Sequence, residues 1–392
     1  ELLLQIYVDD PPWACRGPAE ARWRMTVVLL LFWEAVGTPF SWPKRQTGRR
    51  LQWIGGPLTV RIGNSTTARD DPGRGRGVEV EVPKEKAEES AAACAEFLRK
   101  QVLGRRELRR FAGRSSFFAG LVPHLRPFLS GLWAALAEPP SSKGPVAPGA
   151  MRGGSQFCVW TKQVEHSLRW VLAFLEGVAG APLRRSVYLA EWLAARGTPR
   201  FRPAVDASPW GIGGILLDGA KVVAYFEDAV SEEDQRRLGV VVGDPSSQAI
   251  LEGLALLVAL RLFSPLAGWG QARTRTVLLG VKSDSKAALG AAIKMASPTS
   301  ALNAVGREIA YDSALGDYYV YVHEHVPGVS NKVPDWLSRV HAPATSDPKG
   351  GRPEALSGAR ALQAPMRGDA WWRTMGPPPA ERRPVGGQGV PQ

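Results

Sequence analysis

Four acidic residues in the second half of the chain have the types and surroundings that a divalent-metal site needs. Asp206 lies near the end of an apolar strand pattern, and Asp284 lies just past the apolar run 277–281. Glu252 lies in the first turns of a long apolar helical pattern, and Asp335 begins another helical pattern. Clustered carboxylates can hold two divalent cations roughly 4 Å apart, an arrangement that supports phosphodiester hydrolysis. Each residue alone could equally be a helix cap, a turn residue or a surface charge, so the prediction depends on their order and context together.

A second pair of carboxylates, Asp9 and Asp10, follows a short apolar run and Tyr7 and precedes two prolines. A strand, a tight turn and paired carboxylates are what a metal site at the tip of a β-hairpin requires. Exposed turns often carry two adjacent aspartates, so this pair is not diagnostic by itself.

Regular elements must position these side chains. Between residues 201 and 341, apolar runs of strand length alternate with helical patterns, which predicts an α/β domain. The preceding 200 residues mix strand and helical patterns, and we expect an α/β and α+β multidomain protein. Residues 1–60 are predicted to form a strand hairpin, a helix over 19–37 and a strand near 51–60. A Gly-, Arg- and Asp-rich loop insertion (61–80) and helices interrupted at Pro123 and Pro127 (81–138) are predicted to follow. The remaining predicted segments are a linker and mixed connection (139–200), the α/β domain (201–341) and a disordered tail (342–392).

Composition narrows the classes of partner. The chain has 392 residues and a formal net charge of +12, which favours a polyanionic partner such as nucleic acid, although a solvated basic surface would have the same charge. Its 3 cysteines form no C-x-x-C pair, so a zinc ribbon or disulfide framework is not expected, and an intracellular location in the cytoplasm or nucleus fits. The most apolar run, residues 27–33, is shorter than the ~20 residues that a bilayer requires, so no membrane partner is expected.

Basic residues are concentrated in one helical pattern of the region 81–138. Phenylalanines interleave with these basic residues, and the arginines of interest are Arg105, Arg106, Arg109, Arg110 and Arg114. The pattern fits a helix that follows a phosphate backbone, and it fits equally an amphipathic core helix with a solvated basic face.

The first part of the chain resembles the reverse transcriptases of retroelements. Tyr7-Val8-Asp9-Asp10 matches their Tyr-x-Asp-Asp signature, Lys44 matches a lysine that follows it, and Trp53-Ile54-Gly55 matches a turn that grips the primer end. The arginine-rich stretch 106–119 is similar to the thumb helices that hold the template–primer duplex. The resemblance implies a palm remnant over 1–60 and a thumb over 81–138. It also implies an N-terminally truncated protein, because the fingers and a further catalytic aspartate would precede residue 1. For Lys44 and Gly55, a surface lysine and an ordinary strand-end turn remain open alternatives.

The second part resembles the ribonuclease H domains of LTR and DIRS-like retrotransposons. The order Asp, Glu, Asp, Asp and the ending Asn331-Lys-Val-Pro-Asp335-Trp-Leu-Ser-Arg339 are typical of that family. The resemblance implies that Asp206, Glu252, Asp284 and Asp335 bind Mg²⁺ or Mn²⁺. Pro334 departs from the usual alanine, but proline is tolerated in the first turn of a helix.

These resemblances together predict a reverse transcriptase with a ribonuclease H domain. The expected partners are an RNA–DNA hybrid and a template–primer duplex, and hydrolysis of RNA in the hybrid is the activity expected of this chain. The incomplete polymerase site leaves a second possibility open, a catalytically degenerate remnant that only binds nucleic acid. An integrase of related fold is disfavoured by the ending 331–339 and by the arginine-rich helices upstream.

Overall fold

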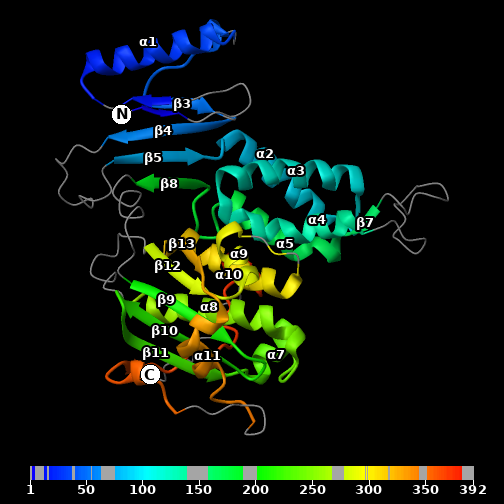
Figure 1. Ribbon diagram of the computed structural model, residues 1–392. Coiled ribbons are helices and arrows are strands. Elements are labelled where there is room, and N and C mark those ends of the chain that lie inside the picture. Colours follow the sequence, from blue (N-terminus) through cyan, green and yellow to red (C-terminus); the bar gives the residue numbers. More distant parts are fainter. Residues whose placement is uncertain are drawn as a thin grey trace, which may run out of the picture.

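The computed structural model shows a mixed α/β protein, as predicted, whose largest sheet contains both parallel and antiparallel strands. Figure 1 shows a small sheet with α1 above it, a helical bundle to one side, and a larger sheet with its helices below. The structure describes residues 2–4, 13–15, 17–37, 40–53, 55–62, 76–138, 158–188, 201–266, 278–295, 297, 299–316, 318–343 and 351–381.

The N-terminal region contains two small antiparallel sheets and one long helix. β1 (Leu2–Leu4) pairs with β2 (Trp13–Cys15), and α1 (Ala19–Ala35) and the 3-10 helix η1 (Trp42–Lys44) follow. The second sheet has the order β3-β4-β5-β8, from the strands β3 (Arg50–Trp53), β4 (Gly56–Ile62), β5 (Arg76–Glu81) and β8 (Arg184–Tyr188). The predicted loop insertion over 61–80 is therefore wrong at both ends, where strands β4 and β5 pair with each other, and residues 63–75 lie outside the described residues.

Four helices form a bundle beside this sheet: α2 (Lys84–Arg99), α3 (Arg105–Leu121), α4 (Arg126–Ala137) and α5 (Thr161–Leu175). The short strands β6 (Val102–Gly104) and β7 (Cys158–Trp160) pair at its end. The chain breaks between α3 and α4 where predicted, because Pro123 starts the 3-10 helix η2 (Pro123–Leu125) and Pro127 lies in the first turn of α4.

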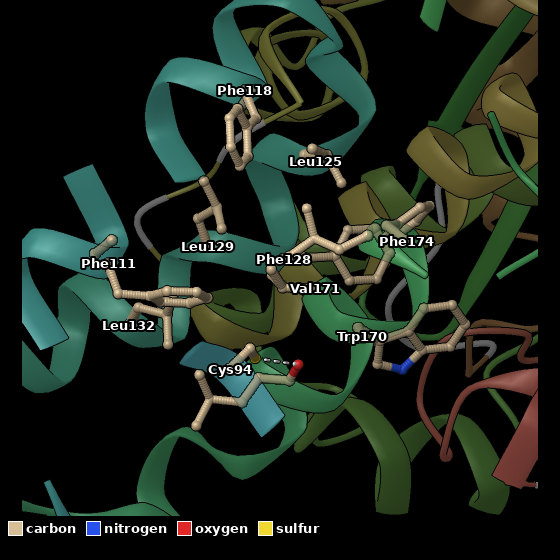
Figure 2. Packing of buried hydrophobic residues seen from close by; sticks show 14 of the residues in the cluster. Cys94, Phe111, Phe118, Leu125, Phe128, Leu129, Leu132, Trp170, Val171 and Phe174 are labelled. Carbon is tan, nitrogen blue, oxygen red and sulfur yellow. Dashed lines mark hydrogen bonds between the residues drawn. The ribbon is translucent and has the colours of Figure 1, made fainter. Parts of the chain in front are cut away.

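One apolar core holds the bundle together (Figure 2). The rings of Phe128 and Trp170 lie 5.2 Å apart between centroids, and Phe174 packs edge-on against Phe128 at 5.0 Å. The buried thiol of Cys94 donates a hydrogen bond to the carbonyl of Leu168 at 3.3 Å. Since Trp170 and Phe174 belong to α5, part of the predicted linker and connection 139–200 is integral to the bundle.

The third region is built on a six-stranded sheet of order β13-β12-β9-β10-β11-β14. Three consecutive strands pair in antiparallel fashion, namely β9 (Phe201–Ala207), β10 (Gly211–Asp218) and β11 (Lys221–Ala229). Two later strands, β12 (Leu278–Ser283) and β13 (Tyr319–His325), run parallel to each other, and β12 is also parallel to β9. The helices of this region are α7 (Glu232–Leu238), α8 (Gln248–Phe263), α9 (Lys286–Lys294), α10 (Ser300–Leu315) and α11 (Lys332–Ser338). These elements agree with the predicted alternation of strands and helices.

The sheet separates two apolar layers. Val205 and Ala207 of β9 pack with α8, whereas Ala204 packs with Leu337 of α11. Successive strand residues point to opposite faces, so Asp206 lies on the same face as α11. One described helix, Pro245–Phe263, is long and apolar enough to cross a bilayer, but most of it is buried against the sheet, as expected of a core helix.

The C-terminal segment differs from the prediction of a disordered tail over 342–392. Residues 351–381 pack on the third region, with η7 (Glu354–Leu356), the two-residue strand β14 (Arg360–Ala361) parallel to β11, and η8 (Pro379–Glu381). The Arg367 guanidinium pairs with the carboxylates of Asp228 at 2.5 Å and Asp234 at 2.7 Å, and Trp372 is 2% exposed. A composition rich in Pro, Gly and Arg suggests disorder, but a few buried anchors are enough to order the segment.

Candidate active site

The structure brings three of the predicted carboxylates together. Asp206, Glu252 and Asp284 each offer a carboxylate oxygen, and these oxygens lie within 4.8 Å of one another. Asp335 lies near enough for its negative charge to raise the pKa of Asp206. Three residues of the predicted quartet therefore lie together, and the fourth is near enough to act on one of them through its charge.

Strand register explains how Asp206 and Asp284 meet. β9 and β12 are parallel neighbours in which Ala204 is opposite Lys282. Asp206 and Asp284 each lie two residues further along, so they reach the same level at one edge of the sheet. Carboxyl ends of parallel strands form such an edge, which is a common place for ligand sites in α/β folds.

Glu252 joins the cluster from the start of α8. The side-chain amide of Gln248, one turn earlier, donates hydrogen bonds to the carbonyl oxygen of Ala207 and to the Glu252 carboxylate, the latter at 3.2 Å. Gln248 thus connects the end of β9 to the acidic side chain and limits the directions in which Glu252 can point.

The electrostatics of the cluster favour a bound cation. Burial, followed by the neighbouring charges of Asp284 and Asp335, raises the pKa of Asp206 to about 8. Burial also raises the pKa of Glu252, against the opposing effect of hydrogen bonds from Ser285 and Gln248. Oδ1 of Asp284 is buried and has no hydrogen-bond partner among the described residues. Crowded carboxylate oxygens with an unused acceptor are a ligand set suited to Mg²⁺ or Mn²⁺.

Helix α11 is fastened to β9 by the polar residues of the ending 331–339. The buried Asn331 donates from Nδ2 to the carbonyl oxygen of Val205 at 2.9 Å. Its own carbonyl oxygen accepts from the backbone N–H of Asp335 at 3.0 Å, so Pro334 leaves this hydrogen bond intact, as predicted. Arg339 pairs with the Asp335 carboxylate at 2.8 Å. These positioning roles depend on contacts between α11 and β9, which the sequence pattern 331–339 does not contain.

Glycines in β10 let α11 approach the sheet closely. A Cβ atom on Gly213 would lie 2.5 Å from Cβ of Leu337 and 2.7 Å from the backbone nitrogen of Ser338, closer than real contacts allow. Gly213 is opposite Asp206 in the sheet. The glycine-rich run of β10 is therefore what allows the α11 backbone to lie next to the carboxylate on β9.

His325 lies beside the cluster without joining it. Its Nε2–H donates to the backbone carbonyl oxygen of Asp284 at 2.9 Å, and the side chain is exposed. This contact gives His325 a structural role at the end of β13, beside the loop that carries Asp284.

Most of the predicted polymerase residues are not placed. Tyr7, Asp9, Asp10 and Ile54 lie outside the described residues, and of Trp53 only the backbone, in β3, is described. Lys44 is exposed at the end of η1. These positions remain predictions from the sequence.

Gly55 forms the turn between β3 and β4. It has a positive φ of 73° and accepts a hydrogen bond from Lys86 of α2 at 3.3 Å. A Cβ atom on Gly55 would lie 3.2 Å from the ring of Phe117 on α3. The predicted primer-gripping turn therefore lies against the arginine-rich helix.

The five arginines of α3 fall into two groups. Arg105 donates to the carbonyl oxygens of Leu136 and Glu138, and Arg114 pairs with Glu89 at 2.8 Å. The other three are exposed and have no acidic partner among the described residues; they are Arg106, Arg109 and Arg110. We call these three the α3 basic face, and they are the arginines available to an external anion.

Comparison with known proteins gives only distant likenesses. No protein-family model and no curated protein matches the chain. It is similar to the crystal structure of RNase H1 from the halophilic archaeon Halobacterium salinarum NRC-1, at 17% identity and a TM-score of 0.26, over 36% of this chain and 94% of that chain.

Two structures of the foamy viral protease-reverse transcriptase are also similar. The one in complex with RNA/DNA hybrid has 15% identity and a TM-score of 0.29, over 89% of this chain and 38% of that chain. The dRH form in complex with double-stranded DNA has 14% identity and a TM-score of 0.28, over 82% of this chain and 46% of that chain. The present chain thus spans less than half the length of either viral protein, and likenesses this distant carry no statement about activity.

Proposed function

We propose that this protein hydrolyses the RNA strand of RNA–DNA hybrids in a reaction that depends on Mg²⁺ or Mn²⁺. The observation that carries the proposal is the carboxylate cluster, in which oxygens of Asp206, Glu252 and Asp284 lie within 4.8 Å of one another and the charge of Asp335 acts on Asp206. The choice of substrate rests on the sequence resemblance of 201–341 to ribonuclease H domains.

The protein's own residues determine how such a site would work. Asp206, Glu252, Asp284 and Asp335 would hold the cations, and the unused Oδ1 of Asp284 is one oxygen free to do so. Bound divalent cations supply a nucleophilic water at neutral pH and stabilise charge on the leaving oxygen. Gln248, through its hydrogen bonds, keeps Glu252 pointed toward Asp206, so the ligand set is organised before substrate arrives.

The α3 basic face would hold the duplex. Arg106, Arg109 and Arg110 are exposed on one helix of the bundle and have no acidic partner in the described part of the chain. Phosphate contacts of this kind supply sequence-independent affinity that falls with salt. A nuclease that acts on hybrids of any sequence needs affinity of this type.

Cleavage of a labelled hybrid in Mg²⁺ tests the proposal, with double-stranded RNA and double-stranded DNA of the same sequence as comparison substrates. We expect cleavage of the hybrid's RNA strand only. Asp284→Asn is expected to lower the rate about 100-fold or more, because a metal ligand is lost. The matched control is Asp369→Asn, which removes an acid whose side chain is 95% exposed and lies outside the cluster. Cleavage that survives Asp284→Asn would exclude the cluster as the catalytic site.

A second candidate function is nucleic-acid binding without turnover. The α3 basic face favours it, because it would bind duplexes whether or not the cluster is active. This alternative predicts salt-dependent binding of the hybrid with no cleavage in Mg²⁺ or Mn²⁺. DNA synthesis stays a prediction from the sequence alone, since Asp9 and Asp10 lie outside the described residues.

A further inference from the structure

The hydroxyl group of Ser338 lies between two elements that carry site carboxylates. Ser338 is the last residue of α11 and is fully buried. Its Oγ lies 3.2 Å from Oδ2 of Asp206 on β9 and 2.9 Å from the backbone carbonyl oxygen of Asp335 on α11. No other hydroxyl in the described residues donates to Asp206.

A single hydroxyl proton cannot serve both acceptors at once. A hydrogen bond to an ionised carboxylate is roughly twice as strong as one to a neutral carbonyl. When Asp206 is ionised, the Ser338 proton therefore points toward it and away from the Asp335 carbonyl. This occupies Oδ2 with a donor and fixes the plane of the carboxylate, which leaves Oδ1 to face the cluster.

Ser338 cannot easily move away from this position. Its carbonyl oxygen accepts a hydrogen bond from the Ser208 hydroxyl at 2.6 Å. Gly213 lies directly beneath it, so that even one added carbon there would collide with the Ser338 backbone. The hydroxyl is thus held at the carboxylate by contacts that do not themselves involve an acidic side chain.

We propose that Ser338 is a positioning residue for metal binding, which orients the Asp206 carboxylate and couples it to the helix that carries Asp335. The proposal rests on the proposed function, because it assumes that the cluster binds divalent cations. Partners that orient metal ligands in this way typically change metal affinity or activity by about 10–100-fold when they are removed.

The test compares Ser338→Ala with Ser90→Ala. Ser90→Ala removes the hydroxyl of a buried serine on α2 of the bundle, which has no hydrogen-bond partner among the described residues. Binding of Mn²⁺ and Mg²⁺ is measured by calorimetry on the full chain without substrate, at a temperature at which both variants are folded. We expect Ser338→Ala to bind about 10-fold or more weakly than wild type, and Ser90→Ala to bind as wild type does.

The outcomes separate the two proposals. If the wild-type chain binds neither cation, the proposed function fails. If wild type binds and Ser338→Ala binds equally well, the proposed function stands and the positioning role is overturned. Should Ser338→Ala not fold, Ser338→Cys fills the site with a slightly larger side chain of the same shape and a much weaker donor, and the same loss of affinity is expected of it.

Discussion

At the scale of single residues, ionisation of the Asp206 carboxyl group is unfavourable in the folded protein when no cation is bound. Burial and the charges of Asp284 and Asp335 raise its pKa from an ordinary value near 4 to about 8. The folded chain therefore holds a proton that the unfolded chain has released, and this residue's contribution to stability falls as pH rises from about 4 to about 8.

Asp206→Asn is expected to stabilise the metal-free protein. Asparagine has no charge to lose, so its advantage over wild type should be small at pH 4 and should grow up to pH 8, reaching at least about 1.4 kcal/mol, the equivalent of one pKa unit. Thermal unfolding in a chelator at several pH values measures this difference. Asp369→Asn, which removes an exposed acid paired with Arg237, serves as control and should gain no stability as pH rises. Equal stability of Asp206→Asn and wild type at pH 8 would mean that the ionised Asp206 carboxylate does not destabilise the folded protein.

The α3 basic face makes a separate prediction about salt. Each of Arg106→Gln, Arg109→Gln and Arg110→Gln should reduce the slope of log K against log salt by about 0.9 for a duplex if that arginine neutralises one phosphate. Arg236→Gln removes the same charge from an exposed position on α7, where Arg236 pairs with Glu233, and should leave the slope unchanged. Fluorescence titration at several salt concentrations measures these slopes. A uniform effect of all four changes would point to net charge rather than to a binding face.

At the scale of elements, the approach of α11 to β10 depends on a glycine. Gly213→Ala places a methyl group 2.5 Å from Cβ of Leu337, so α11 must move outward with Asp335 and Ser338. Crowding of this kind costs about 1–3 kcal/mol, and the weakened metal site should lower hybrid cleavage as well. Thermal unfolding and the cleavage assay measure the two effects.

Gly290→Ala is the matched control for that change. Gly290 lies inside α9, and a Cβ atom there would meet nothing within 4 Å. Alanine favours a helix over glycine by up to about 1 kcal/mol, so this variant should be as stable as wild type or more so. If both alanine variants behaved alike, the close approach of α11 would not be what makes Gly213 necessary.

The elements also show what could be predicted from the sequence and what could not. Asp206 and Asp284 could be predicted as metal ligands because they lie at the ends of apolar runs, and the end of a strand is a local feature of the sequence. The role of Ser338 depends on which face of β9 meets α11, which no local pattern contains. The alternation of Val and Glu over 78–82 indicates a short exposed strand, but it does not show that β5 pairs with both β4 and β8, which come from segments more than 100 residues apart. These failures share one cause, since each involves contacts between residues distant in sequence.

At the scale of the whole molecule, helix α10 connects the bundle to the third region. Tyr311 packs in the bundle core, and its hydroxyl donates to the carbonyl oxygen of Ala179 at 2.8 Å. Asn303 donates from Nδ2 to the carbonyl oxygen of Pro127 at 2.8 Å. A buried helix that contributes to both regions holds the α3 basic face in a constant relation to the carboxylate cluster.

The C-terminal segment makes a second connection between the same two regions. The Thr374 hydroxyl donates to the buried Glu308 carboxylate of α10 at 2.6 Å. Nε2 of His166 and Nε1 of Trp170, both on α5 of the bundle, donate to the carbonyl oxygens of Thr374 at 2.8 Å and Gly376 at 3.0 Å. The segment predicted to be disordered is thus a strap that contacts both regions.

Ending the chain after residue 350 should therefore destabilise the protein as a whole. Asp234 would keep its buried position but lose the Arg367 guanidinium, and breaking a buried ion pair costs about 3–5 kcal/mol. Calorimetric unfolding should show a lower transition temperature, and limited proteolysis should separate the bundle from the third region. A chain that ends after Glu381 keeps every described contact of the strap and is the control. If the chain ending after residue 350 unfolded at the same temperature as this control, α10 alone would be sufficient to hold the two regions together.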